Sequence, residues 1–251
     1  MPRPCSPHAA LAPPPQLLAA DHSILLDFDG TLVDLVDRPE AVFIDSALSA
    51  LVRRLNGAFH GRMAFVSGRS VAQLEAFLGA ALDGIAMVGS HGAEIHAGAR
   101  RVSPVRPPAL IAAERLIQTT FGDRDGVIVE VKSLGVAVHY RLAPDVESGA
   151  RALVDRIAIE SGLAVQKGKM MIELRAAGHD KGSGIATLMT QPPFIGTVPV
   201  FAGDDVTDEA GFVAVEELGG IGVLVGPARP TAARYRLDDV AAVRAWLGQT
   251  A

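Results

Sequence analysis

The stretch Ile24-Leu25-Leu26-Asp27-Phe28-Asp29-Gly30-Thr31 joins a short apolar run to a polar turn. A run of this length that ends at a turn signal predicts a buried strand over residues 24–28. Side chains two positions apart on a strand share a face. Because the chain is turning at this point, Asp27 and Asp29 are expected to point into the same cleft at different depths.

Similar apolar runs alternate with helical patterns on both sides of the middle of the chain. The predicted strands cover residues 63–66, 85–88, 198–202 and 221–225, and the predicted helices cover 48–55, 70–78, 184–189 and 240–247. Ser70 and Gln73 match a capping box at the start of one helix, and Asp238 is expected to cap the last one. This alternation predicts an α/β fold with a doubly wound parallel sheet.

The pattern changes between residues 98 and 177. Helical spacings at 109–121 and 146–157 are each followed by two strand-like runs, which predicts a small α+β unit. We therefore expect a core made of residues 21–97 and 178–251 that carries an inserted cap at 98–177. The proline-rich residues 1–20 are expected to form a poorly ordered tail.

Composition narrows the possible functions. The chain has 251 residues and a formal net charge of −5, which argues against a general nucleic-acid binder. No apolar stretch approaches the roughly 20 residues that a membrane span needs, and the early prolines interrupt any signal-peptide core. The single cysteine, Cys5, excludes an intramolecular disulfide and fits a reducing compartment. We expect a cytoplasmic monomer that binds neither nucleic acid nor membrane.

Polar residues follow at least three of the predicted strands. They are Asp27-Phe28-Asp29, Ser67-Gly68-Arg69 and Gly203-Asp204-Asp205. The carboxyl ends of parallel strands meet at one crevice, where ligands bind. Carboxylates gathered there repel one another unless a cation lies among them, and oxygen-only ligands favour Mg²⁺.

This set of residues suits phosphoryl transfer. One carboxylate of the pair Asp27 and Asp29 can attack phosphorus, while the other donates a proton to the leaving group and later activates water. Ser67, Thr31 and nearby backbone amides can bind the phosphoryl oxygens. Lys181 can neutralise the charge that Asp27 shares with the phosphate.

Each motif also has a purely structural interpretation. Asp-Gly is usually a turn, and a serine between a strand and a helix is usually an N-cap. The acidic stretch 204–209 can be a helix start that the macrodipole favours. The complete set in one order, each member at a predicted strand end, favours the catalytic interpretation.

The stretches 27–32, 67–69, 181–182 and 203–209 resemble the four motifs of the haloacid dehalogenase superfamily. The resemblance implies a Rossmann-like core with an inserted cap, Asp27 as the nucleophile and Asp29 as the acid/base. It implies Mg²⁺ on the Asp27 carboxylate, the Asp29 carbonyl and Asp204, with Asp205 and Asp208 beside these ligands. The residues expected to bind phosphate are Thr31, Ser67, Gly68 and Arg69.

The cap carries charged residues inside apolar strands, which is costly unless they meet partners or ligand. Gly-Ser-His-Gly-Ala-Glu at 89–94, Glu-x-Lys at 130–132, His-Tyr-Arg at 139–141 and Lys-x-x-x-Glu-x-Arg at 169–175 resemble the trehalose-6-phosphate phosphatase family. The resemblance implies sugar contacts from Glu130, Lys132, Lys169 and Glu173, with Glu94 and Arg141 as further candidates. Cross-strand ion pairs on a solvent face are the alternative interpretation.

The expected substrate is trehalose 6-phosphate, and the expected cofactor is Mg²⁺. Other sugar phosphates, such as sucrose phosphate or mannosylglycerate phosphate, and a phosphomannomutase reaction remain as alternatives. A non-catalytic sugar-phosphate sensor is an alternative of a different class. Asp27, Asp29, Lys181 and Asp204 are all present, so the motifs give no sign of lost chemistry.

Overall fold

Strand β1 (His22–Leu26) lies in the middle of an eight-stranded sheet of order β12-β11-β10-β1-β2-β3-β4-β5. Ile24 and Leu26 belong to one buried cluster and Leu25 to another, as the two-residue period of a strand requires. The sheet is therefore covered on both faces, which confirms the doubly wound α/β class. This computed structural model describes residues 11–17, 20–36, 42–79 and 84–250.

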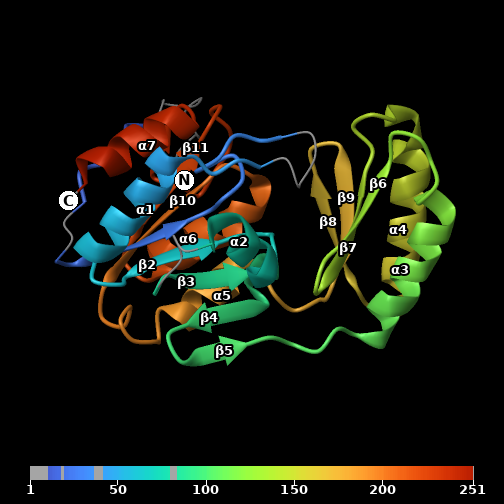
Figure 1. Cartoon of the computed structure of the whole chain (residues 1–251), viewed down its shortest axis with the longest axis horizontal. Helices are drawn as coiled ribbons and strands as arrows, with labels where there is room; N and C mark the ends of the chain where they lie inside the picture. The colour runs from blue at the N-terminus through green and yellow to red at the C-terminus, as the bar shows by residue number, and fades with distance from the viewer. Residues whose placement is uncertain (1–10, 18–19, 37–41, 80–83, 251) are drawn as a thin grey trace, which may run out of the picture.

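The core strands and helices follow the predicted alternation. The strands are β2 (Met63–Val66), β3 (Ala86–Gly89), β4 (Glu94–Ala97), β5 (Arg100–Val102), β10 (Val198–Gly203), β11 (Ile221–Val225) and β12 (Tyr235–Leu237). Helices α1 (Ser46–Ala58), α2 (Val71–Leu78) and α7 (Val240–Gln249) pack on one face, and α5 (Lys181–Leu188) and α6 (Glu209–Glu217) on the other (Figure 1). Strands β4 and β5 extend the parallel sheet in antiparallel fashion. The sequence did not predict β4, β5 or β12, because these short strands carry no long apolar run.

The second unit is a four-stranded antiparallel sheet of order β6-β7-β9-β8. Its elements are α3 (Pro108–Phe121), β6 (Ile128–Val131), β7 (Gly135–His139), α4 (Glu147–Ser161), β8 (Ala164–Gly168) and β9 (Met171–Arg175). Figure 1 shows α3 and α4 on the side of this sheet away from the core, so the uncovered sheet face is turned toward the core. We call this unit the cap.

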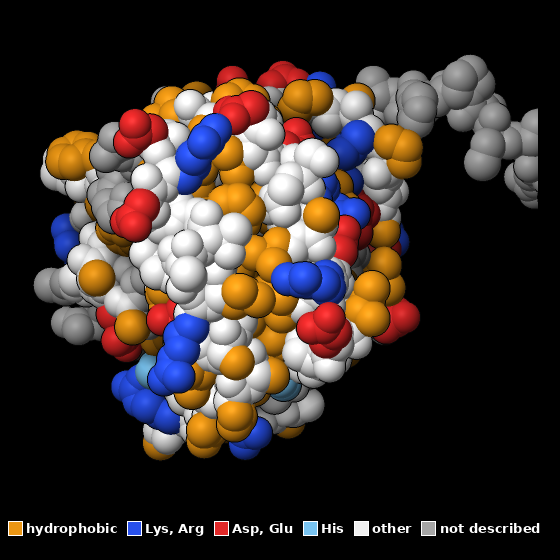
Figure 2. Space-filling view, turned by 90° about the vertical axis from the view of Figure 1, so that its right-hand side faces the viewer, with side chains coloured by type: hydrophobic (Ala, Val, Ile, Leu, Met, Phe, Trp, Pro, Cys, Tyr) orange, Lys and Arg blue, Asp and Glu red, His pale blue; other side chains and the backbone are white. Residues whose placement is uncertain are grey.

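The outer helical face of the cap is turned to the viewer in Figure 2, where apolar and charged side chains are interspersed. Ile111, Leu116 and Ile159 are exposed on these helices. No helix in the described ranges has the length and apolar character to cross a membrane.

The boundary between core and cap differs from the predicted one at residue 98. Strand β5 pairs with β4 in the core sheet, so residues 100–102 belong to the core and the first connection is 103–107. Gly98 lies in the β4–β5 turn, where its φ of +57° favours glycine. The second connection runs through 176–180, close to the predicted position.

The N-terminal prediction also needs correction. Leu17 is buried in the core, and the Trp246 indole Nε1 donates a 3.0 Å hydrogen bond to the Pro15 carbonyl. Residues 11–17 therefore contact the core instead of forming a loose tail, because apolar Leu17 and the carbonyls of this segment find partners there. Residues 1–10, 18 and 19 lie outside the described part of the chain.

Two helix starts differ from the expected ones by a few residues. The N-cap of α7 is Asp239, whose side chain accepts from the Ala242 N–H at 2.8 Å, and not Asp238, which instead pairs with Arg236. Helix α5 begins at Lys181 behind a capping box formed by Asp180 and Ser183. This box fixes Lys181 in the first helical turn and aims it at the end of β1.

Candidate active site

Asp27 lies directly beyond β1, at the centre of the sheet. Its backbone N–H donates to the Ala202 carbonyl of β10 at 2.9 Å, which holds the residue beside the end of that strand. Its buried carboxylate Oδ1 accepts a 2.8 Å hydrogen bond from Lys181 Nζ, although the two residues are 154 positions apart. The structure thus brings the predicted nucleophile, Asp27, next to Lys181, the side chain predicted to neutralise its charge.

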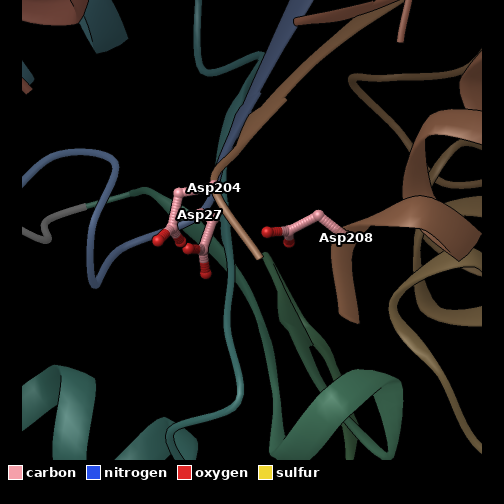
Figure 3. Close-up of side chains that lie close together, drawn as sticks. All are labelled: Asp27, Asp204 and Asp208. Carbon is pink, nitrogen blue, oxygen red and sulfur yellow. The ribbon is translucent and has the colours of Figure 1, made fainter. Parts of the chain in front are cut away.

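Three carboxylates meet at this point. Asp27, Asp204 and Asp208 each offer one oxygen, and these atoms lie within 4.8 Å of one another. Figure 3 shows the Asp204 and Asp27 side chains next to each other and the Asp208 carboxylate pointing toward them. Gly30 has a φ of +79°, and a Cβ there would lie 2.3 Å from Asp204 Oδ2, so glycine permits this approach. The all-oxygen donor set fits Mg²⁺.

Asp208 has a different task from the other two carboxylates. Its Oδ1 accepts from Lys181 Nζ at 2.6 Å, and its Oδ2 accepts from the Asp205 N–H at 2.8 Å. Both oxygens are therefore engaged in holding Lys181 and the turn after β10. Asp27 also binds Lys181 and Thr31, and it is the family resemblance that implies Asp27 and Asp204 as the carboxylates that bind a cation.

Burial and mutual repulsion perturb the ionisation of this cluster. Burial raises the pKa of Asp27 well above its usual value; the charge of Lys181 opposes the rise, and Asp208 and Asp204 add to it. Burial, together with Asp208 and Asp205, raises the pKa of Asp204 to about 7. Burial disfavours charged Lys181, but Asp208 and Asp27 outweigh that cost and raise its pKa. A divalent cation between Asp27 and Asp204 would favour ionisation of both.

Asp29 is held by Arg69. The guanidinium donates from Nε to Asp29 Oδ2 at 2.6 Å and from Nη2 to Oδ1 at 2.7 Å. The Cζ atom of Arg69 also lies 4.7 Å from the centroid of the Phe77 ring, so a cation–π contact supports the guanidinium from the α2 side. Arg69, expected to bind phosphate, orients the predicted acid/base in this structure.

The other predicted phosphate ligands surround Asp27. Ser67 Oγ accepts the Arg69 backbone N–H at 3.1 Å, and Thr31 Oγ1 donates to Asp27 Oδ2 at 3.4 Å. A Cβ on Gly68 would lie 2.6 Å from the His91 ring, so this glycine is needed for close packing. Ser67 and Gly68 line the same cavity as Asp27, whereas Thr31 is fully buried.

The charged residues of the cap form a compact network. Lys132 Nζ donates to Glu173 Oε2 at 2.6 Å, and His139 Nε2 donates to Glu130 Oε2 at 2.8 Å. Strand register places Glu130 and Glu173 opposite the same residue, Ala137, so they share a sheet face. Cross-strand ion pairing was the alternative interpretation of these charges; the Lys132–Glu173 pair is buried and faces the cavity instead of solvent.

The network keeps its carboxylates ionised. Burial acts to raise the pKa of Glu173, but Lys132 and His91 outweigh it and bring the value to about 2. Burial likewise opposes ionisation of Glu130, and His139 and Lys132 bring its pKa to about 2. These side chains are therefore strong, preoriented hydrogen-bond acceptors.

A cavity of about 220 Å³ lies between the core and the cap. Asp27, Asp29 and Asp204 line it from the core. The predicted sugar contacts that line it from the cap are Glu130, Lys132, Arg141, Lys169 and Glu173. The arrangement joins a phosphate-handling end to a polar end that can bind hydroxyl groups.

Glu94 is the predicted contact that the structure does not bring to the cavity. Its Oε2 accepts from the Val71 N–H at 2.8 Å and from Ser90 Oγ at 3.1 Å. Glu94 therefore caps the first turn of α2 and anchors the turn that carries His91. Its place on β4, which pairs with β3, explains this role.

His91 and His139 are not among the predicted sugar contacts, although both lie in stretches that resemble the family. Both line the cavity, and His91 Nε2 lies 3.8 Å from Glu173 Oε2. Ser90, His91 and Gly92 all have positive φ, so three successive left-handed residues present the imidazole. Burial lowers the pKa of His91, which favours the neutral ring. The signal for this turn in the sequence is Gly92 immediately after His91.

A carboxylate–lysine centre at the strand ends of a doubly wound sheet, beneath an inserted α+β cap, defines the haloacid dehalogenase-type phosphatases. A solved structure described as a trehalose-6-phosphate phosphatase related protein matches with a TM-score of 0.75 and 32% identity, over 90% of this chain and 95% of that one. The C-terminal domain of the Candida albicans trehalose-6-phosphate phosphatase matches in fold, with a TM-score of 0.78 at 24% identity over 91% of each chain.

A sequence model of the trehalose-phosphatase family matches residues 25–241. The trehalose-6-phosphate phosphatase of Escherichia coli (strain K12) is 36% identical over 233 residues, which cover 92% of this chain and 86% of that protein. A probable trehalose-phosphate phosphatase of Sinorhizobium fredii is 36% identical over 231 residues, 90% of this chain and 85% of that protein. The chain belongs to the trehalose-phosphatase family, as its motifs predicted.

Proposed function

We propose that this chain hydrolyses trehalose 6-phosphate to trehalose and phosphate, the last step of trehalose biosynthesis. One observation carries the proposal: a single cavity joins Asp27 and Lys181 of the core to Glu130, Lys132 and Glu173 of the cap. The core end suits the phosphoryl group, which every substrate of this type shares. The cap end offers alternating donors and acceptors, which a sugar with many hydroxyls requires.

The reaction proceeds in two displacements. A carboxylate oxygen of Asp27 attacks phosphorus, the bond from phosphorus to the sugar oxygen breaks, and Asp29 donates its proton to that oxygen. Trehalose leaves, and Asp27 carries the phosphoryl group. Asp29 then takes a proton from a water that attacks phosphorus, the bond to Asp27 breaks, and phosphate is released.

The neighbouring residues organise these steps. Lys181, 2.8 Å from Asp27, balances the charge that the nucleophile shares with the phosphoryl group. Arg69 holds both oxygens of Asp29, so Asp29 must release one of these hydrogen bonds to carry the proton that it donates. Ser67 and Gly68 line the cavity beside Asp27 and supply polar groups for phosphoryl oxygens.

Asp27, Asp204 and the Asp29 carbonyl are the groups proposed to hold Mg²⁺. A bound magnesium ion supplies positive charge to the phosphate oxygens. Asp205 and Asp208 support this site: the Asp205 N–H donates to Asp208, which in turn holds Lys181.

The residues assigned to the proposed chemistry all belong to this chain, and we propose that it acts as a monomer. We place this monomer in the cytoplasm, because its single cysteine fits a reducing compartment.

The test is phosphate release from a panel of sugar phosphates, with magnesium and with chelator. We expect a strong preference for trehalose 6-phosphate and loss of release with chelator. A preference for sucrose phosphate or mannosylglycerate phosphate would keep the chemistry and overturn the role of the cap. Transfer of phosphate to a sugar would indicate a mutase, and tight binding without release would indicate a sensor.

A further inference from the structure

Core and cap touch each other directly at the rim of the cavity. Gln73 Nε2, on core helix α2, donates a 2.8 Å hydrogen bond to Glu130 Oε1, on cap strand β6. A second contact joins core and cap, since the hydroxyls of Ser90 and Ser133 lie 3.1 Å apart. By comparison, the core residue His91 stands 3.8 Å from the other cap carboxylate, Glu173.

The orientation of the Gln73 amide follows from its place in the capping box. Its Oε1 accepts from the Ser70 N–H at 2.9 Å and from Ser70 Oγ at 3.2 Å. The amide oxygen is thereby committed to the helix start, and the NH₂ group must face the cap. A helix-capping side chain thus presents a fixed donor toward the cavity.

Glu130 is held at both oxygens. Gln73 donates to Oε1 from the core, and His139 lies 2.8 Å from Oε2 within the cap. Each carboxylate oxygen can accept a second hydrogen bond, so the held carboxylate still has acceptor capacity for a ligand hydroxyl. With Gln73 absent, the core would no longer fix one of these two oxygens.

We propose that Gln73 is a positioning residue that docks the cap on the core through Glu130 and so sets this carboxylate for sugar recognition. The inference rests on the proposed function, because it takes Glu130 as a sugar ligand. Cap closure and sugar binding are thereby coupled: the geometry that binds the sugar is complete only when β6 lies against α2. Gln73 touches neither phosphorus nor Asp27, and its effect falls on substrate affinity.

Gln73→Glu tests the proposal while keeping the capping-box interaction at the N-terminus of helix α2. A glutamate at this position accepts the Ser70 N–H as glutamine does, since either residue completes a capping box. The atom facing Glu130, however, changes from a donor to a charged acceptor, and the two carboxylates repel. Gln118→Glu, an exposed change of the same charge on the outer cap helix, is the matched control.

A hydrogen bond to a charged group contributes enough binding free energy for its loss to weaken affinity about tenfold or more. We therefore expect KM for trehalose 6-phosphate to rise at least about tenfold in Gln73→Glu, with kcat within about threefold of wild type. Hydrolysis of p-nitrophenyl phosphate, which has no sugar hydroxyls, should change less than about twofold. Backbone amides of β6 should exchange faster with deuterium in this variant and unchanged in Gln118→Glu.

Three results would overturn the inference. An unchanged KM in an active Gln73→Glu enzyme would show that Gln73 serves only the capping box at the start of helix α2. Equal losses with both substrates would point to damage at the catalytic centre. Unchanged exchange in β6 would show that Gln73 does not dock the cap. A wild type inactive on trehalose 6-phosphate but active on p-nitrophenyl phosphate would instead reject the proposed substrate, and the exchange measurement would then decide the docking role alone.

Discussion

Arg69 binds both carboxylate oxygens of Asp29 through hydrogen bonds of 2.6 and 2.7 Å. The pair connects the end of β2 to the turn after β1, and the Phe77 ring lies against the guanidinium. The planar guanidinium of arginine forms two parallel hydrogen bonds with a carboxylate and so fixes both the orientation and the distance of that carboxylate. The ammonium group of a lysine does not. The orientation of Asp29, the proposed acid/base, thus depends on an arginine that the sequence suggested for phosphate binding.

Arg69→Lys is expected to lower kcat about tenfold or more, because lysine keeps the charge but loses the bidentate geometry that orients Asp29. Steady-state kinetics with trehalose 6-phosphate provides the measurement. Arg53→Lys, an exposed change on α1, is the control and should leave kcat unchanged. A larger effect on KM than on kcat would assign Arg69 to phosphate binding instead.

Asp27→Asn is expected to abolish turnover while the protein stays folded. An amide cannot attack phosphorus, so the loss should exceed about 10⁴-fold in kcat. Asp208 still partners Lys181 at 2.6 Å, which limits the destabilisation from the removed charge. Phosphate release and circular dichroism check the two parts, with exposed Asp155→Asn as the control. Retained turnover would refute Asp27 as the nucleophile.

Magnesium is expected to raise the thermal midpoint, because a cation that binds only the folded chain stabilises it by about 2.7 kcal/mol at a hundredfold excess over Kd. That stabilisation corresponds to a shift of about 5–10 °C in a chain of this size. Asp204→Asn should remove most of the shift, since it takes away one carboxylate of the cluster. An equal shift in this variant and in wild type would place the ion elsewhere.

Low pH is expected to lower the stability of the folded chain through protonation of Glu173 in the cap. Its pKa is about 2 in the folded chain against an ordinary 4.5, so the folded state binds this proton more weakly than the unfolded state does. The stability contributed by ionised Glu173 is therefore complete above about pH 4.5 and is lost as the pH falls toward about 2.

Urea unfolding between about pH 5 and pH 3 measures this dependence. Glu173→Gln should be less stable than wild type at pH 5, because Lys132 loses its 2.6 Å partner, and its stability should fall less steeply with acid. Exposed Glu160→Gln should follow the wild-type curve. Parallel curves for wild type and Glu173→Gln would contradict the assignment.

Local patterns predicted much of the core. In the run before Asp27, the side chains that point to either face of the strand are apolar, which indicates that both faces are buried. The capping box of Ser70 and Gln73 is recognisable because its two residues are only three positions apart. Strands β4 and β5 escaped prediction because a residue such as Arg101 pairs on an edge, where no apolar period is required. The cap boundary moved for the same reason.

The roles of individual polar residues were harder to predict. Glu94 occurs in a stretch that resembles the family motif, yet its carboxylate binds the Val71 N–H, because β4 turns back along β3. Gln73 meets Glu130 across 57 positions of sequence, and no local pattern reports such a contact. Both roles follow from which surfaces the fold brings together.

By itself, the sequence determined the class of fold, the family and the chemical groups available, because apolar periodicity, turn residues and short motifs act over a few neighbouring positions. Only the tertiary structure decided which groups meet: Lys181 with Asp27 and Asp208, Arg69 with Asp29, and Gln73 with Glu130. Hydrogen bonds and ion pairs act over a few ångströms, so partners distant in the chain are chosen by strand order and by the position of the cap on the core.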